Sequence, residues 1–378
     1  MKKSMLPDYK LIEIQILASG DILQIPVYTF QGKKEGKKVY IQANLHGAEI
    51  VGNAVIYELI EFFSTLNNED INGEIILVPM CNPIGVNQRN LFFSTGRYSP
   101  YDGLNWNRIF WDYSHENINI DDFVRENMNF SKQDIQANFF DNILNKFQEK
   151  QNNINHRRGV SFSEHYRNIL QSLSLSANYI IDIHSSSVSS IDYLYCFDYR
   201  QKSADYFLLD YAILMNKYDG NAFDEAFLNP WLILEKKLSQ AGRNLIFDVE
   251  SWTLELGSGM RVNEESVKKG FKGIINYLSA KKILNLEVVL PEKSTKFIPK
   301  NTIKSYYAIQ GGIIRHRLKE GTKVKEGDML YQILSFSKGS KMPFIIDIES
   351  ADEGIIFDVS TNDTVNQGEY ILGIFPHV

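Results

Sequence analysis

Apolar residues recur along the chain in short runs that end in polar turns, a pattern typical of buried strands. Residues 37–63 fit a strand, a turn and a helix whose apolar positions recur near the 3.6-residue helical period. Further buried strands are predicted within residues 73–86, 177–187 and 243–259. Because strands that alternate with helices are typical of parallel sheets, we predict an α/β protein with a mixed, mostly parallel central sheet flanked by helices.

Residues 112–170 interrupt this alternation with a polar stretch rich in Asn and Gln. Ser131 and Asp134 have the spacing of a capping box. The residues after them place apolar side chains on one face of a helix: Ile135, Phe139, Ile143 and Phe147. We predict a helical insertion between two strands. Two interpretations stay open, a lid over a site and a solvated decoration, and the second is the commoner.

The last part of the chain has a different pattern. Prolines and lysines mark a boundary at about residues 288–296, between a main domain at 1–288 and a smaller one at 296–378. Within the smaller domain, residues 312–333 and 354–374 align with a single gap, each running from a glycine through an apolar pair to a polar turn. Two such copies predict an all-β barrel-sandwich with internal twofold symmetry.

This repeat resembles the two halves of lipoyl and biotinyl carrier domains. In those domains a modifiable lysine stands between methionines in the central hairpin. Here the matching position falls at about Pro343, with only Lys341 and Met342 nearby. A structural role for the small domain is therefore favoured over a prosthetic-group carrier.

Charge and cysteine content narrow the class of partner. The 378 residues include 40 basic and 46 acidic side chains, a net charge of -6, so there is no broad basic surface for nucleic acid or anionic lipid. Small molecules or ordinary protein surfaces are the expected partners, and a homo-oligomer is left open. Cys81 and Cys196 are too few for a disulfide framework or a thiolate zinc cluster.

The N-terminal stretch does not have the form of a signal peptide. Its apolar residues are interrupted by Pro7, Asp8, Lys10 and Glu13. Elsewhere no apolar run approaches the roughly 20 residues that span a bilayer. We therefore expect a soluble, cytoplasmic protein that does not insert in a membrane.

His46 and Glu49 follow a buried strand directly, although an imidazole and a carboxylate should both prefer water. Buried carboxylates are rare unless they are paired or bound to a metal. Catalytic zinc commonly takes two histidines and one glutamate, so this pair needs a second imidazole. His184 also stands where an apolar strand stops, at the carboxyl end where ligands of α/β sheets collect. The three residues form a candidate metal site.

A metal-dependent hydrolase also needs a general base, and a partly desolvated carboxylate suits this task. Glu255 is the candidate, because leucines flank it and two glycines follow it at a strand end. Asp248 and Glu250 are rival carboxylates in the same segment. Asp182, two residues before His184, could hold an imidazole in the required tautomer.

Arg89 and Arg108 follow polar turns and could bind a substrate carboxylate or stabilise the oxygen that gains charge during attack on a carbonyl. Considered singly, each is better explained as an ordinary surface ion pair.

Taken in order, these segments resemble a known family. The motifs are "HGAE" at His46, "NPIGVNQR" ending in Arg89, "NRIF" at Asn107, "DIHS" at His184 and "TLELG" at Glu255. They resemble the zinc carboxypeptidase-like superfamily, and in particular its succinylglutamate desuccinylase and aspartoacylase group, over residues 37–280. Members of this group carry a C-terminal barrel-like domain near the active site, which suits the small β domain.

The resemblance implies a fold, a cofactor and residue roles. It implies one Zn²⁺ per chain, with these ligands: His46, Glu49 and His184. It implies that Glu255 is the general base and acid, and that Arg89 polarises the scissile carbonyl. It also implies that Asn107 and Arg108 grip a substrate carboxylate. Asn105 offers a second amide two residues earlier, so the amide ligand is open between the two.

We therefore expect a zinc-dependent amidohydrolase that deacylates an N-acyl amino acid or a related small carboxylate-bearing substrate. The main alternative is a metallocarboxypeptidase acting on peptides or cell-wall fragments. An open cleft would favour the peptidase, and a pocket roofed by the small domain or the insertion would favour the deacylase. A zinc-binding protein without turnover ranks lower, because every required residue is present.

Overall fold

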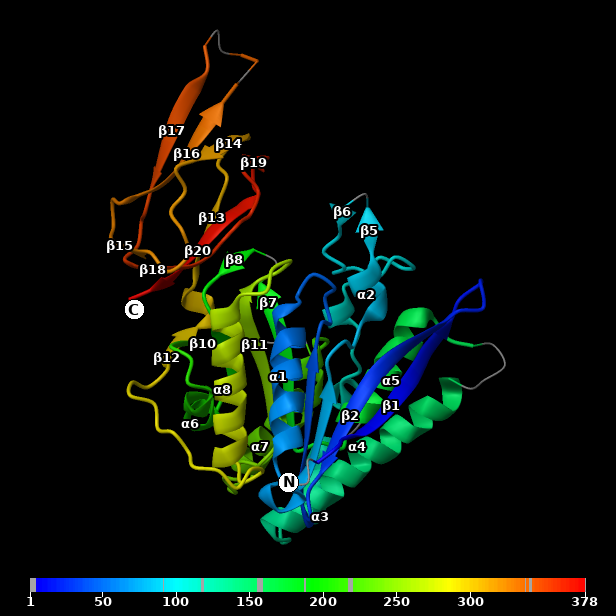
Figure 1. Cartoon of the computed structure of the whole chain (residues 1–378). Coiled ribbons are helices and arrows are strands. Elements are labelled where there is room, and N and C mark those ends of the chain that lie inside the picture. The colour runs from blue at the N-terminus through cyan, green and yellow to red at the C-terminus, as the bar shows by residue number, and fades with distance from the viewer. Residues whose placement is uncertain are drawn as a thin grey trace.

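The computed structural model describes residues 5–90, 92–116, 119–154, 159–186, 188–216, 220–336, 338–339 and 342–377. Its centre is a nine-stranded mixed sheet (Figure 1). The strand order is β1 (Asp8–Ile16), β2 (Ile22–Gln31), β4 (Asn72–Val78), β3 (Lys34–Ala43), β7 (Tyr179–Ser186), β11 (Glu250–Ser258), β9 (Tyr193–Phe197), β10 (Tyr211–Met215) and β12 (Lys296–Pro299). The pairs β3–β4, β3–β7, β7–β11, β9–β10 and β10–β12 are parallel, and the remaining neighbours are antiparallel. The predicted mixed α/β architecture is confirmed.

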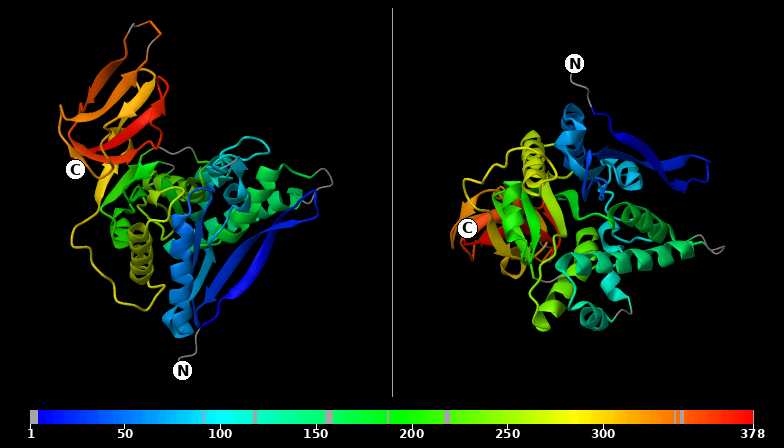
Figure 2. Two further views of the ribbon diagram at one scale, coloured as in Figure 1. Left: turned by 45° about the horizontal axis from the view of Figure 1, so that its top comes forward. Right: turned by 90° about the horizontal axis from the view of Figure 1, so that it is seen from below.

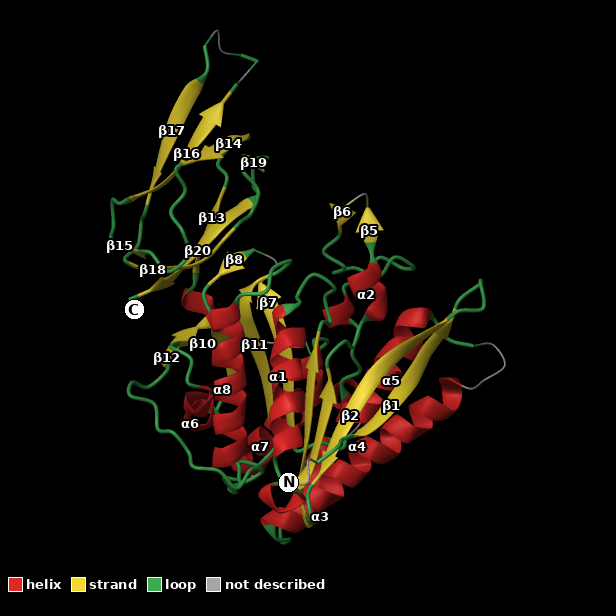
Figure 3. Cartoon of the chain, in the orientation of Figure 1, coloured by secondary structure: helices red, strands yellow, loops and turns green. Residues whose placement is uncertain are grey.

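Helices cover both faces of this sheet (Figure 3). On one face lie α1 (Val51–Thr65) and α8 (Glu264–Ala280), and on the other lies α7 (Phe223–Gln240). Both faces of the sheet are apolar, because successive side chains of a strand point to opposite faces. In β3, Val39 packs with the α1 side whereas Tyr40 packs with the α7 side. The apolar stripe predicted for the first helix is buried on α1.

Shorter elements connect these layers. They are the helices α2 (Pro83–Asn87) and α6 (Gln201–Ala204), the strands β5 (Arg89–Asn90) and β6 (Phe92–Phe93), and the 3₁₀ turns η1 (Asn68–Asp70), η2 (Trp106–Arg108), η3 (Tyr113–His115), η4 (Asp205–Phe207) and η5 (Lys300–Thr302). None of the described helices is long and apolar enough to cross a membrane.

The insertion is helical, as predicted, and forms α3 (Ile120–Asn127), α4 (Lys132–Ile154) and α5 (Phe162–Ser174). Ser131 accepts a hydrogen bond from the Asp134 amide at 3.1 Å, which caps α4. The predicted apolar face of α4 is buried in the main core, so the interpretation as a solvated decoration is wrong. The lid interpretation is not supported either, because no described residue of 112–170 lines the pocket presented below.

The C-terminal residues form two further sheets (Figure 2). One contains β13 (Lys304–Tyr307), β20 (Tyr370–Pro376), β18 (Gly354–Val359) and β15 (Lys323–Val324); the other contains β17 (Phe344–Glu349), β16 (Met329–Ser335), β14 (Gly312–Arg315) and β19 (Thr364–Val365). Strands of the first sequence repeat pair with strands of the second, since β14 pairs with β19 and β15 pairs with β18. Barrel-sandwich closure of these sheets stays a prediction, and Lys341 of the possible carrier hairpin lies outside the described residues.

The C-terminal sheets are joined to the main domain by strand pairing and by aromatic packing. Strand β8 (Ser189–Ser190) pairs with β18, and β12 joins β10 although the predicted boundary assigned it to the small domain. The Tyr193 ring lies 5.8 Å from that of Phe357 and 5.9 Å from that of Phe375, measured between centroids. The small domain therefore packs directly on a strand of the main sheet.

Candidate active site

The carboxyl ends of two parallel strands bring the candidate ligands together. His46 follows β3, and His184 lies near the end of its parallel neighbour β7. Between β3 and α1 the chain turns at Asn44, which has a φ of 71° and whose side-chain amide donates to the Gly47 carbonyl at 3.0 Å. A Cβ at Gly47 would lie 2.0 Å from the Gly85 carbonyl oxygen, so only glycine allows this approach.

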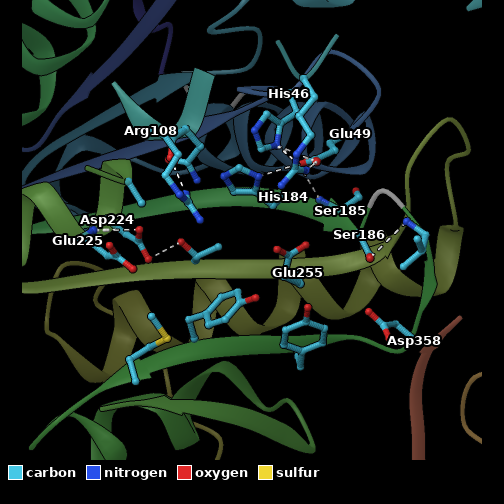
Figure 4. A pocket seen from close by; sticks show the side chains of 18 of the residues that line it. His46, Glu49, Arg108, His184, Ser185, Ser186, Asp224, Glu225, Glu255 and Asp358 are labelled. Carbon is cyan, nitrogen blue, oxygen red and sulfur yellow. Dashed lines mark hydrogen bonds and ion pairs between the residues drawn. The ribbon is translucent and has the colours of Figure 1, made fainter. Parts of the chain in front are cut away.

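His46, Glu49 and His184 converge on one point (Figure 4). The Nδ1 atom of His46 lies 2.9 Å from one Glu49 carboxylate oxygen, and the Nδ1 atom of His184 lies 2.6 Å from the other. All three side chains are buried, and one potential ligand atom from each lies within 4.8 Å of the others. Two imidazole nitrogens and a carboxylate oxygen are the donor set of catalytic zinc sites, so these residues fit such an ion.

The far nitrogens of both imidazoles are also held. His46 Nε2 lies 2.9 Å from Asn105 Oδ1, and His184 Nε2 lies 2.8 Å from Asp182 Oδ2. An acceptor at Nε2 favours the tautomer that leaves Nδ1 free to bind a metal. The predicted contact of Asp182 with an imidazole is confirmed. Gln42 in turn donates to Asp182 at 3.1 Å, which extends the buried network.

The charges of this cluster favour a cation at its centre. Burial opposes ionisation of Glu49, but the two imidazoles outweigh it and lower the pKa of that carboxyl below its usual range. Burial would lower the pKa of His184, whereas the Asp182 and Glu49 carboxylates raise it well above its usual value. The carboxylates therefore stabilise positive charge between the two rings, which a divalent cation would supply.

Glu255 lies on β11 at the position directly paired with His184 of β7. A bulge follows it, at which Gly257 has a φ of 63° and donates its N–H to Asp192 at 2.9 Å. The Oε2 atom of Glu255 is buried without a hydrogen-bond partner among the described residues. Burial, only partly opposed by His184, raises the pKa of this carboxyl to about 7, which suits proton transfer near neutral pH.

The rival carboxylates serve other contacts. Asp248 pairs with Lys37 and Lys281, near the start of β11. Glu250 accepts a hydrogen bond from Tyr277 at 2.8 Å and pairs with Lys281. Neither lines the pocket that contains Glu255.

The two predicted arginines differ in their position relative to the pocket. Arg108 lines the pocket, but Arg89 does not, because its side chain is exposed and donates to the carbonyls of Val86 at 2.7 Å and Gln88 at 2.9 Å. Arg97, which the sequence reasoning missed, reaches the site instead, with its guanidinium 3.6 Å from Glu49.

Backbone hydrogen bonds between two loops place Arg97 at the site. The Gly47 amide donates to the Gly96 carbonyl at 3.1 Å, and the Ala48 amide donates to the Thr95 carbonyl at 2.9 Å. No hydrophobic period marks this segment. The local signal that precedes Arg97 is Gly96, which has a φ of 55° and at which a Cβ would lie 2.2 Å from the Gly85 carbonyl oxygen.

Asn107 and Asn105 have distinct contacts. Asn107 lines the pocket, and its side-chain oxygen accepts from the Phe223 amide at 2.8 Å. Asn105 accepts from the Asn107 amide at 2.9 Å in addition to its contact with His46. Asn105 therefore orients a candidate ligand, whereas Asn107 is fixed at the pocket wall beside α7.

The candidate ligands, Glu255 and the side chains of Arg97, Asn107 and Arg108 surround a cavity of about 320 Å³. Its wall also includes charged and phenolic side chains from several elements: Asp224, Glu225, Lys300, Asp358, Tyr193, Tyr195 and Tyr370. Asp358 and Tyr370 belong to the C-terminal sheets. The pocket is thus a polar cavity built by both parts of the chain.

Comparison with known proteins agrees with this arrangement. Residues 35–281 match the model of the succinylglutamate desuccinylase/aspartoacylase catalytic domain. The chain therefore belongs to the succinylglutamate desuccinylase/aspartoacylase family, which is related to the zinc carboxypeptidases. Membership supports a hydrolase or deacylase activity. No curated protein matches the sequence.

Solved structures of similar proteins cover nearly the whole chain. A candidate succinylglutamate desuccinylase/aspartoacylase from Shewanella frigidimarina NCIMB 400 is 28% identical with a TM-score of 0.88, over 100% of this chain and 98% of that one. A protein of the same description from Shewanella amazonensis SB2B is 31% identical with a TM-score of 0.85, over 97% and 98%. The ectoine utilization protein EutE (DoeB) from Ruegeria pomeroyi, at 16% identity and a TM-score of 0.66 over 99% and 96%, shares the fold.

Proposed function

We propose that the protein is a zinc-dependent amidohydrolase that removes the acyl group from an N-acyl amino acid or a related small carboxylate-bearing amide. The observation that carries this proposal is the buried cluster of His46, Glu49 and His184 beside a Glu255 carboxyl oxygen that has no hydrogen-bond partner among the described residues. A metal centre alone would not need a second carboxyl with a pKa near neutrality.

The three ligands would hold Zn²⁺ through His46 Nδ1, His184 Nδ1 and the Glu49 carboxylate. Zinc held there would supply a Lewis acid that polarises the substrate carbonyl and lowers the pKa of a water molecule. Asn105 and Asp182 keep both imidazoles in the binding orientation.

Glu255 acts as the general base and then as the general acid. Its Oε2 atom takes a proton from the attacking water and gives it to the departing amine nitrogen. Burial supports both steps, because it places the pKa of Glu255 at about 7, where the carboxyl exchanges a proton readily at neutral pH.

The two arginines of the pocket have different proposed roles. Arg97, rather than Arg89, stabilises the carbonyl oxygen, because its guanidinium reaches the ligand cluster. Arg108 binds a substrate carboxylate at the pocket wall. Asn107 positions that wall through Phe223 and can donate to substrate with its side-chain amide.

A small substrate is favoured over a peptide, since Asp358 and Tyr370 of the C-terminal sheets line the pocket. We further propose that residues 1–288 form the catalytic domain and 296–378 a barrel-sandwich domain. One zinc per chain and a cytoplasmic location are predictions from the sequence, and a homo-oligomer stays open.

Metal analysis of the purified protein, combined with a screen of N-acetyl and N-succinyl amino acids, tests this function. We expect one zinc per chain and turnover of at least one amide in the screen. Zinc-loaded protein that cleaves peptides with blocked N-termini but none of these amides would instead support the peptidase.

A further inference from the structure

The pocket has two ends, on either side of Glu255. At one end Thr253 donates to Asp224 at 2.7 Å, and Phe223 donates to Asn107, the neighbour of Arg108. At the other end Ser258 donates to Ser189 at 3.2 Å, and Ser190 pairs with Asp358. Figure 4 shows the same order, with Arg108 and Asp358 on opposite sides of Glu255.

The C-terminal sheets direct Asp358 and Tyr370 into the pocket wall. Strand β18 has an irregular register between Ile356 and Asp358, opposite Gly373 of β20. A Cβ at Gly373 would lie 2.6 Å from the Tyr370 hydroxyl oxygen and 2.9 Å from Asp358 Oδ1. Glycine at 373 therefore makes room for the hydrogen-bonded pair of Tyr370 and Asp358.

The strand that carries Asp358 is also fixed to the main domain. The Ile191 amide donates to the Phe357 carbonyl at 2.9 Å, and Phe357 packs on Tyr193. Tyr193 in turn pairs with Glu255 across β9 and β11. The position of Asp358 is consequently coupled through the sheet to that of the proposed general base.

Asp358 is a buried carboxyl, only 9% exposed, in a wall that also contains a candidate base. The Tyr370 hydroxyl donates to its Oδ1. None of the ion pairs between described residues includes Asp358, although Lys300 lines the same pocket. Burial raises the pKa of Asp358 to about 6, so the carboxyl is still mostly ionised at neutral pH. A buried carboxylate of this kind is stabilised by a cationic partner.

We propose that Asp358, oriented by Tyr370, binds a cationic nitrogen on the acyl part of the substrate while Arg108 binds a carboxylate on its amine part. The preferred substrates are then aminoacyl amino acids, small amides with an ammonium group at one end and a carboxylate at the other. This inference rests on the proposed function, because it assumes that the scissile amide lies at Glu255 between the two groups.

Matched ligands that differ only in this charge test the proposal. Glycyl, β-alanyl and γ-aminobutyryl amides replace CH₃ by NH₃⁺ relative to propionyl, butyryl and pentanoyl amides. The amine part of each pair of ligands is alanine, glutamate or lysine. Binding to the zinc-loaded, full-length Glu255→Gln variant is measured by calorimetry, so the readout does not depend on turnover. For at least one length we expect the aminoacyl ligand to bind about tenfold tighter or more.

Adding Asp358→Asn should abolish this preference, whereas the control Asp347→Asn should keep it. Asp347 is exposed on β17 and accepts a hydrogen bond from Gln332 at 2.7 Å, away from the pocket. Tyr370→Phe removes the group that orients Asp358 and should reduce the preference to a fewfold difference. It also decides the matter if the Asp358 variant does not fold, because an unchanged preference in Tyr370→Phe would overturn the proposal.

Two other results would overturn it as well. One is an equal affinity for both members of every pair, and the other is a preference that persists in Asp358→Asn, which would place the cation at Asp224 and Glu225. Turnover of neutral N-acyl amino acids without any charge preference would support the proposed function and overturn the cation subsite at Asp358. A charge preference that requires Asp358, without turnover of any amide by the wild type, would instead support the cation subsite and contradict the proposed function.

Discussion

Glu255 and His184 occupy directly paired positions on the neighbouring parallel strands β11 and β7. Adjacent strands lie about 4.8 Å apart, so sheet register alone sets the spacing between the proposed base and a proposed ligand. The bulge at Gly257, held by Asp192, interrupts this pairing just beyond Glu255, and the pairing resumes between Ser258 and Ser186. Sheet register therefore sets the spacing of Glu255 and His184, whereas His46 and Glu49 lie in the loop that follows β3.

Asp182 should control zinc affinity without being a ligand. It holds His184 Nε2 at 2.8 Å, so Asp182→Asn loses the charge that stabilises the binding orientation of the ring. We expect zinc affinity to fall about 10-fold to 100-fold, measured by competition with a chromogenic chelator. Unchanged affinity would mean that the ring is held by Glu49 and packing alone.

Arg97 and Arg89 should differ in their effect on turnover. Arg97 reaches the ligand cluster, so Arg97→Ala should lower kcat by about 100-fold. Arg89 bonds to local carbonyls outside the pocket, so Arg89→Ala should change kcat no more than a fewfold. Steady-state kinetics on the best amide of the screen separate the two, and the reverse ranking would restore Arg89 to the role first predicted.

Gly47 should be essential for the loop that carries His46. A Cβ there would lie within 2.0 Å of the Gly85 carbonyl oxygen, and backbone cannot move aside as a flexible side chain could. We expect Gly47→Ala to reduce the free energy of unfolding by about 2 kcal/mol or more, measured by urea denaturation. Gly311→Ala is the control, because its nearest neighbour would be an ordinary 3.4 Å away. Equal effects of both substitutions would contradict the packing described for residue 47.

Asp248 should make stability depend on pH in the acid range. Burial opposes its ionisation, but Lys281, Lys37 and Tyr179 lower its pKa to about 2. Because the pKa of an unfolded aspartate is about 3.9, the folded state gains stability from the ionised group above that pH and loses it as pH falls towards 2.

Asp248→Asn should therefore destabilise the protein at pH 7 and lose this effect between about pH 4 and pH 2. The side chain is 42% exposed, so solvent screening limits the difference to about 1 kcal/mol. Urea denaturation of both proteins across this range measures it. A difference independent of pH would show that the carboxylate charge is not the cause.

The three candidate ligands and Glu255 were accessible from the sequence because each lies in the carboxyl-terminal half of a strand or in the turn that follows one. Parallel pairing brings such ends together, so a periodic pattern was enough to propose their proximity. Asn105 and Asn107 could not be separated in this way, since Asn105 caps the short turn η2 that contains Asn107 and the two differ in what they contact.

Other features depended on contacts that leave no periodic trace. Arg97 enters the site through hydrogen bonds between two irregular loops, and Asp358 through pairing of β8 with β18. The role of α4 was misjudged for a related reason. Its polar composition suggested a solvated helix, yet its narrow apolar face, which includes Phe139, is buried against Trp231 with ring centroids 5.0 Å apart.

The most direct test of the whole account compares zinc content and amide turnover in two variants, Glu255→Gln and His46→Ala. We expect Glu255→Gln to retain one zinc per chain but to lose turnover, because the glutamine cannot accept the proton. His46→Ala should lose both zinc and turnover. Turnover by Glu255→Gln equal to that of the wild type, or full zinc content in His46→Ala, would contradict the assignment of base and metal site.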